Sequence, residues 1–135
     1  MIFITRKENF NAAHNLWNNK WSDEKNREVF GACANLHGHN FELEVTVKGE
    51  IDEDTGFVID LKVLGNIIQQ EIIEKIDHKY LNRDVDFMAG KLTSTENFAI
   101  EIWKILQPKI EGVSSAKLHS IKLQETAKNS VEYFG

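Results

Sequence analysis

The chain has only one cysteine and one proline among its 135 residues. Cys33 cannot form a disulfide within the chain, so we expect it to be a free thiol in a reducing cytoplasm. No apolar run approaches the length that spans a bilayer. The first ten residues lack the basic start and long apolar centre of a signal peptide. These absences argue against a membrane protein and against a secreted, disulfide-bonded protein.

Clusters of basic residues are also missing. The net charge is −5, and no run rich in lysine or arginine supplies the positive stripe of a nucleic-acid-binding protein. The composition, 41% hydrophobic and 27% charged, is typical of an ordinary globular protein. Because neither a repeat nor a linker interrupts the chain, we expect a single domain over residues 1–135.

Two segments alternate apolar and polar residues, as β-strands do. In residues 2–14, His14 would lie on the same face as Phe10, because side chains alternate with period two. Residues 39–48 alternate more regularly and predict a strand with one face in the core. The Asn-rich segment 15–36 between them has no periodicity and predicts a long loop.

Two amphipathic helices are expected further along the chain. Residues 61–76 place their apolar side chains at helical spacing. Residues 94–107 predict a second helix, which the sequence "TSTE" would start as a capping box with Glu96 as its reciprocal member. Pro108 is expected to end this helix, since proline cannot donate the backbone hydrogen bond that would continue it.

Two strands, at residues 116–125 and 130–134, are predicted to close the chain. The order of two strands, two helices and two strands predicts an α+β domain, with helices on one face of a four-stranded antiparallel sheet. Such a sheet has exposed edges, and pairing with other subunits is one way to cover them. Oligomerisation is therefore a reasonable hypothesis.

The stretch "GACANLHGHNF", residues 31–41, holds the main chemical signal. His37 and His39 would point to the same side of a strand, and Gly38 between them would let a backbone or a ligand approach. His14 would be a third ligand if the two strands are neighbours. Three histidines around Zn²⁺ leave a fourth position open, as catalytic zinc sites do.

Other interpretations of these residues remain open at this point. The histidines would also fit a surface or core edge without metal. Cys33 would complete a closed Cys-His₃ structural site, although its position in the loop favours a free thiol.

Two more sites contain ionisable residues. Asp77 and His78 follow a helix. In one interpretation the carboxylate orients the imidazole for proton transfer. In the other, the histidine is there only because the helix dipole favours it. Glu125 has the strand parity of His119 and Ile121. A carboxylate there would accept two parallel N–H bonds from the amidine edge of a pterin or a guanine, or it would simply turn toward water.

Several motifs, in their order along nearly the whole chain, resemble the 6-pyruvoyltetrahydropterin synthase and 6-carboxytetrahydropterin synthase family. They are "FNAAH" (10–14), "CANLHGHNF" (33–41), "GFVIDLKVL" (56–64), "DHKYLN" (77–82), "TSTENFAIEIW" (93–103) and "LQET" (123–126). The resemblance implies a T-fold that forms barrel-like trimers, stacked into homohexamers with active sites between subunits. It also implies 7,8-dihydroneopterin triphosphate as the substrate.

Residue roles follow from the same resemblance. It implies that the zinc ligands are His14, His37 and His39. It implies that Cys33 is the catalytic base and that Asp77 and His78 are its proton-transfer partners. The resemblance also implies that Glu125, Thr95 and Glu96 bind the pterin. For Glu96, a role in capping the helix is the alternative.

The spacing Cys-x₃-His-Gly-His resembles the bacterial 6-carboxytetrahydropterin synthases of queuosine biosynthesis. This branch would form 6-carboxy-5,6,7,8-tetrahydropterin and release acetaldehyde and triphosphate. One alternative is the pyruvoyl branch, which eliminates triphosphate and keeps all the side-chain carbons. Another is a non-catalytic zinc- or pterin-binding module, which would keep the metal ligands but typically lose the base or the proton shuttle.

Overall fold

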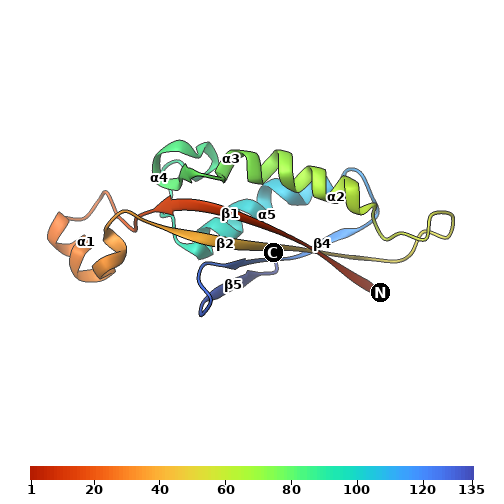
Figure 1. The fold of residues 1–135 in the computed structure, drawn as a ribbon, viewed down its shortest axis with the longest axis horizontal. Helices are drawn as coiled ribbons and strands as arrows, with labels where there is room; N and C mark the ends of the chain where they lie inside the picture. Colours follow the sequence, from red (N-terminus) through yellow and green to blue (C-terminus); the bar gives the residue numbers. More distant parts are fainter.

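The computed structural model describes residues 1–135 and shows a five-stranded sheet in the order β3-β1-β2-β4-β5 (Figure 1). β3 runs parallel to β1, and all other neighbouring strands are antiparallel. The strands are β1 (Ile2–His14), β2 (His37–Gly49), β3 (Lys79–Tyr80), β4 (Lys117–Gln124) and β5 (Ser130–Tyr133).

β1 and β2 pair without interruption along their whole length, from Ile2 opposite Gly49 to His14 opposite His37. The predicted alternation of β2 is confirmed, because its apolar side chains are buried and its polar ones lie on the other face. On that other face, the hydroxyls of Thr5 and Thr46 lie 2.7 Å apart. The long register brings the carboxyl end of β1 and the amino end of β2 together.

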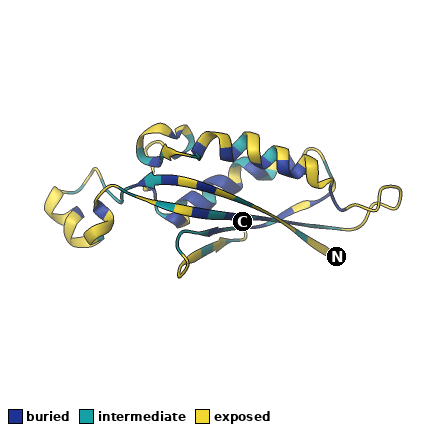
Figure 2. Cartoon of the chain, in the orientation of Figure 1, coloured by how far each residue is buried: buried dark blue, intermediate teal, exposed yellow.

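The helices that cover the sheet all lie on one face. α2 (Leu61–Ile68), a π-helical turn (Gln69–Ile73) and α3 (Glu74–Ile76) follow one another and confirm the predicted helix over residues 61–76. α5 (Thr95–Glu111) packs beside them. Figure 2 shows buried residues on the sheet and on the helix sides that face it. The largest fully buried side chains include Phe41, Phe98, Leu43, Leu64, Ile68, Ile72 and Leu106.

The segment expected to be a loop contains a helix, α1 (Asp23–Phe30), and a 3₁₀ turn, η1 (Gly31–Ala34). Ser22 caps α1, since its hydroxyl accepts a hydrogen bond from the N–H of Lys25 at 3.1 Å. Only one residue of α1, Asn26, is buried, so no apolar stripe marks this short helix. α1 lies beyond the paired ends of β1 and β2 (Figure 1).

The prediction of four strands missed β3, which contains only two residues and is too short to show alternation. α4 (Leu81–Asp84) and a 3₁₀ turn (Asp86–Met88) follow it. The predicted end of the second helix before Pro108 is wrong, because α5 continues to Glu111. Ile110 is fully buried there, and the Pro108 carbonyl accepts a hydrogen bond from the N–H of Gly112 at 3.0 Å.

β4 also departs from the expected parity. Its register with β2 shifts between Thr46 and Val47, which pair with Ser120 and Leu118 and leave His119 outside the ladder. This bulge buries Leu118 on the face of Ile121 and leaves His119 against the exposed ring of Phe3, with ring centroids 4.7 Å apart. No helix of the fold combines the length and the apolar character needed to cross a bilayer.

Candidate active site

Three histidines meet where β1 ends and β2 begins. His14 lies directly opposite His37, and His39 lies two residues further along β2, on the same face. One ligand nitrogen from each ring lies within 4.8 Å of the others. The backbones approach closely here, since a Cβ on Gly38 would lie 3.3 Å from the carbonyl oxygen of Ala12. The strand pairing on which a role for His14 depended is therefore present.

Two of the rings are oriented by backbone carbonyls. Nδ1 of His14 lies 2.7 Å from the carbonyl oxygen of Thr93, and Nδ1 of His37 lies 2.7 Å from that of Asn35. A carbonyl oxygen only accepts hydrogen bonds, so each Nδ1 carries the proton and donates it. Each Nε2 is then left with a free lone pair, which is the form that binds a metal ion.

The surroundings keep these rings in the metal-binding state. Burial lowers the pKa of His14, although the Thr93 carbonyl opposes this effect. Burial also lowers the pKa of His39, against the opposing charge of Glu125. In both rings the lowered pKa favours the neutral imidazole, which is the form that binds a metal ion. Nε2 of His14 and Nε2 of His39 are buried without a hydrogen-bond partner, a costly arrangement that a bound metal ion would relieve.

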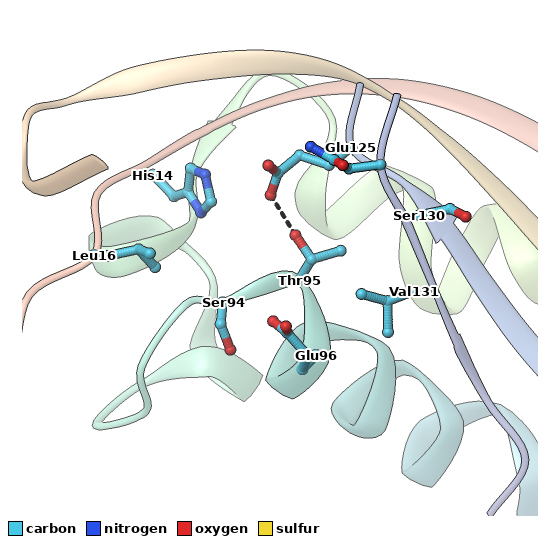
Figure 3. A pocket seen from close by; sticks show the side chains of 9 residues that line it. His14, Leu16, Ser94, Thr95, Glu96, Glu125, Ser130 and Val131 are labelled. Carbon is cyan, nitrogen blue, oxygen red and sulfur yellow. Dashed lines mark hydrogen bonds between the residues drawn. The ribbon is translucent and has the colours of Figure 1, made fainter. Parts of the chain in front are cut away.

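A cavity of about 380 Å³ adjoins the histidines (Figure 3). His14 lies at one side of this cavity, and the side chains of Glu125 and Thr95 point toward each other next to it. The hydroxyl of Thr95 donates a hydrogen bond to Oε2 of Glu125. The other carboxylate oxygen, Oε1, lies 3.7 Å from Nε2 of His39. A single carboxylate therefore lies between the cavity and the histidines, with one oxygen free of protein hydrogen bonds.

The start of α5 differs from the predicted capping box. Ser94 is the N-cap, and its hydroxyl accepts a hydrogen bond from the N–H of Asn97 at 3.2 Å. Glu96 is therefore one position too early to be the reciprocal member of a capping box. Its side chain is exposed and lines the cavity beside Thr95.

The thiol of Cys33 is exposed, in the turn η1. The backbone of this residue is fixed, because its carbonyl oxygen accepts a hydrogen bond from the N–H of Leu16 at 2.8 Å. Cys33 does not belong to the metal-type cluster, which contains only the three histidines. This geometry favours a free thiol over a closed Cys-His₃ site.

Asp77 and His78 form a hydrogen-bonded pair at the edge of the sheet. Nδ1 of His78 lies 2.9 Å from Oδ1 of Asp77, which also accepts a hydrogen bond from the N–H of Asn11 at 3.0 Å. That backbone bond is the main reason why the pKa of Asp77 lies below its ordinary value. His78 has a left-handed backbone, with φ of 60°, and its side chain is 77% exposed. The pair is thus held rigidly but open to solvent.

Within one chain, this pair belongs to another surface than the cavity beside His14. His78 lines a second hollow together with Asn11, Asn40 and His39, so this hollow borders the histidine cluster at His39. No hydrogen bond or ion pair links Asp77 or His78 to Cys33. The chain therefore brings together the histidines, Glu125 and Thr95, whereas Asp77 and His78 do not line the cavity that contains Glu125.

Some cavity residues were not anticipated from the sequence. They are Leu16, Ser94, Asn129, Ser130 and Val131. The last three enter because β5 folds back on β4 directly after Glu125. The predicted turn between these strands was the only signal for them, and no local pattern pointed to the Thr93 carbonyl behind His14.

Comparisons with known proteins agree with this architecture. The family described as "6-pyruvoyl tetrahydropterin synthase" matches residues 3–135. A solved structure of Caenorhabditis elegans 6-pyruvoyl tetrahydropterin synthase superposes with a TM-score of 0.88 at 35% identity, over 99% of this chain and 95% of that one.

Two curated relatives bear on the branch. A protein from Dictyostelium discoideum named 6-pyruvoyl tetrahydrobiopterin synthase is 39% identical over 99% of this chain and 96% of its own length. A Synechocystis protein named 6-carboxy-5,6,7,8-tetrahydropterin synthase is 30% identical over 99% of this chain and 94% of its own. The expectation that the chain stands nearest to the bacterial carboxy branch is therefore unsupported, because a short loop spacing was a weaker guide than identity over the whole chain. The α+β T-fold and the match along almost every residue establish that the chain belongs to the 6-pyruvoyl tetrahydropterin synthase family of lyases.

Proposed function

We propose that the protein is a zinc-dependent 6-pyruvoyltetrahydropterin synthase, which converts 7,8-dihydroneopterin triphosphate to 6-pyruvoyltetrahydropterin with elimination of triphosphate. The observation that carries the proposal is a group of three metal-type histidines beside Glu125, with His14 and Glu125 both lining one cavity. Identity to relatives named for the pyruvoyl reaction favours this product over the carboxy product.

The metal position follows from the donor set. Three clustered imidazoles, two of which have Nδ1 bound to a backbone carbonyl and Nε2 free, suit Zn²⁺ and would leave room for a substrate oxygen. A bound zinc ion would supply Lewis-acid stabilisation of the negative charge that develops on that oxygen. The ligand roles of His14, His37 and His39 are part of this proposal.

Glu125 would hold the pterin ring. Its two carboxylate oxygens match the two parallel N–H groups of the pterin amidine edge, and Thr95 fixes the carboxylate from behind. Glu96, at the rim of the cavity, would contact the same ring. Because Glu125 would fix the ring and lies beside the histidines, the substrate side chain would be held within reach of them.

Cys33 would act as the base that removes a proton from the substrate side chain. Asp77 and His78 of the same chain do not line the cavity and make no hydrogen bond to Cys33, so we propose a homo-oligomer in which the partner subunit's Asp77 and the partner subunit's His78 approach Cys33 and relay the proton. A hexamer of two stacked trimers, as the family resemblance implies, would provide such interfaces.

The carboxy reaction is the second candidate, and the Cys-x₃-His-Gly-His spacing favours it. Both reactions use the same substrate and the same metal site, and they differ in whether a two-carbon fragment leaves. Product analysis therefore separates them directly.

The test is mass spectrometry of the products after the zinc-loaded oligomer is incubated with 7,8-dihydroneopterin triphosphate. We expect 6-pyruvoyltetrahydropterin and triphosphate, with no acetaldehyde. A 6-carboxytetrahydropterin with acetaldehyde would move the protein to the carboxy branch. Substrate binding without any turnover by fully metallated oligomer would instead support the non-catalytic module.

A further inference from the structure

A network of hydrogen bonds surrounds the proposed ligand His14, which is 3% exposed. On one side, the Thr93 carbonyl accepts the hydrogen bond from Nδ1 of His14 at 2.7 Å. On the other side, the chain passes from His14 into Asn15. The backbone of Asn15 is bound by the side chain of Asn82, in α4, and this side chain also contacts Thr93.

Asn82 uses both the oxygen and the nitrogen of its side-chain amide in this network. Its Oδ1 accepts a hydrogen bond from the N–H of Asn15 at 3.0 Å, and its Nδ2 donates to the carbonyl of Asn15 at 2.8 Å. The Thr93 hydroxyl lies 3.0 Å from the same Oδ1 and 3.2 Å from the Asn15 carbonyl oxygen. One asparagine side chain thus connects the residue after the ligand to the residue that holds the ligand's ring.

The side chain of Asn15 extends the same network. It accepts a hydrogen bond from the hydroxyl of Tyr80 at 2.6 Å and donates to the carbonyl of Ala34 at 3.3 Å. Ala34 follows Cys33 in the turn η1, and Tyr80 lies in β3. The position of Asn15 is therefore fixed from three separate segments.

We propose that Asn82 and Thr93 are positioning residues of the metal site. Together they fix the backbone next to His14 and the tautomer of its ring, so that Nε2 faces His37 and His39. This inference rests on the metal role of the histidines in the proposed function. The physical reason is that an imidazole whose Nδ1–H is held by a fixed acceptor is a more basic and less mobile ligand.

The network predicts a specific effect of removing one hydroxyl. Thr93→Val has nearly the same shape but loses the one hydroxyl proton that is shared between Asn82 Oδ1 and the Asn15 carbonyl, so the Thr93 carbonyl is no longer held in place. We expect zinc affinity, measured by competition with a chromophoric chelator, to fall about tenfold to hundredfold. Asn82→Ala should have a similar or larger effect, and Thr93→Ser, which keeps the hydroxyl, should restore most of the affinity.

A second readout separates positioning from general stability. The visible spectrum of the Co²⁺-loaded protein reports the geometry of the ligands, and it should shift in Thr93→Val but not in Thr93→Ser. Asn26→Ala is the matched control, because the buried Asn26 likewise holds a loop through several backbone hydrogen bonds, none of which reaches His14. It should lower the unfolding temperature while leaving zinc affinity and the Co²⁺ spectrum unchanged.

Wild-type zinc affinity in Thr93→Val would overturn the inference, as would an equal loss of affinity in Asn26→Ala. Should Asn82→Ala not fold, the two Thr93 variants still decide the question. Failure of the unmodified protein to bind zinc would refute the metal site itself. If the unmodified protein binds zinc and the Thr93 variants bind it equally well, only the positioning role is refuted.

Discussion

Glu125→Gln isolates the proposed pterin anchor with almost no change of shape. In the protein, Oε2 of Glu125 accepts the Thr95 hydroxyl, and Oε1 has no hydrogen-bond donor from the chain. A bound pterin would donate one N–H to each oxygen. The substitution replaces one of these acceptors by an NH₂ group, which faces a substrate N–H and cannot accept from it.

The expected loss can be worked out from these two bonds. A hydrogen bond to a charged group contributes about 1.5–3 kcal/mol, and a neutral one about 0.5–1.5 kcal/mol. One charged bond is lost and the other becomes neutral, so the sum is about 3 kcal/mol. Since about 1.4 kcal/mol corresponds to a factor of ten, pterin affinity should fall about 100-fold.

The assay is a fluorescence titration with neopterin, which carries the ring without the triphosphate, together with kcat/KM for the full substrate. Zinc content must match that of the unmodified protein, because Glu125 lies 3.7 Å from Nε2 of His39. Glu132→Gln is the matched control, since Glu132 lies exposed in the adjoining strand β5 and does not line the cavity. An unchanged Kd in Glu125→Gln, or an equal loss in Glu132→Gln, would refute the bidentate anchor.

Three further predictions follow from other parts of the structure. Cys33→Ala should keep its full zinc content, measured by elemental analysis, while its kcat falls about 10²–10⁴-fold. Loss of zinc together with the thiol would point instead to a closed Cys-His₃ site. Removal of zinc by a chelator should lower the unfolding temperature, because a metal at 1,000 times its Kd stabilises the fold by about 4 kcal/mol, and an unchanged melting curve would argue against a metal at the histidines. Burial raises the pKa of Glu101, but ion pairs with Lys104 and Lys91 outweigh this effect and hold the pKa below the ordinary value of 4.5. The contribution of Glu101 to the stability of the fold is therefore complete above pH 4.5 and is lost as the pH falls through the lowered pKa. Glu101→Gln should therefore unfold more easily at pH 7 and show a flatter acid dependence in urea titrations, and parallel curves for both proteins would contradict this assignment.

Local pattern was sufficient for most of the regular structure. The strands over residues 2–14 and 39–48 and the helix over 61–76 were predicted close to their observed bounds. Each is long enough for its periodicity to show which side chains enter the core. The same alternation placed His37 and His39 on one face. Short elements such as β3 and α1 lack that length, and they were missed.

Cap and bulge positions depended on competition between neighbouring residues. The sequence "TSTE" offers more than one hydroxyl that can start the helix, and packing selected Ser94, which leaves Glu96 at the cavity. At His119 a bulge reversed the expected parity of one residue, because Leu118 is buried in its place. The parity of Glu125, which lies beyond the bulge, was unaffected.

The sequence by itself therefore determined the α+β class, the two long strands and the residue types of the candidate metal site. Only the tertiary structure decided that His14 lies opposite His37, that Thr93 binds its ring while Asn82 binds the backbone of Asn15, and that Asp77 and His78 lie outside the cavity of Glu125. The physical reason is distance along the chain. Periodicity reflects the backbone geometry of adjacent residues, whereas a pairing such as Thr93 with His14 joins residues 79 positions apart and depends on the packing of the whole sheet and its helices.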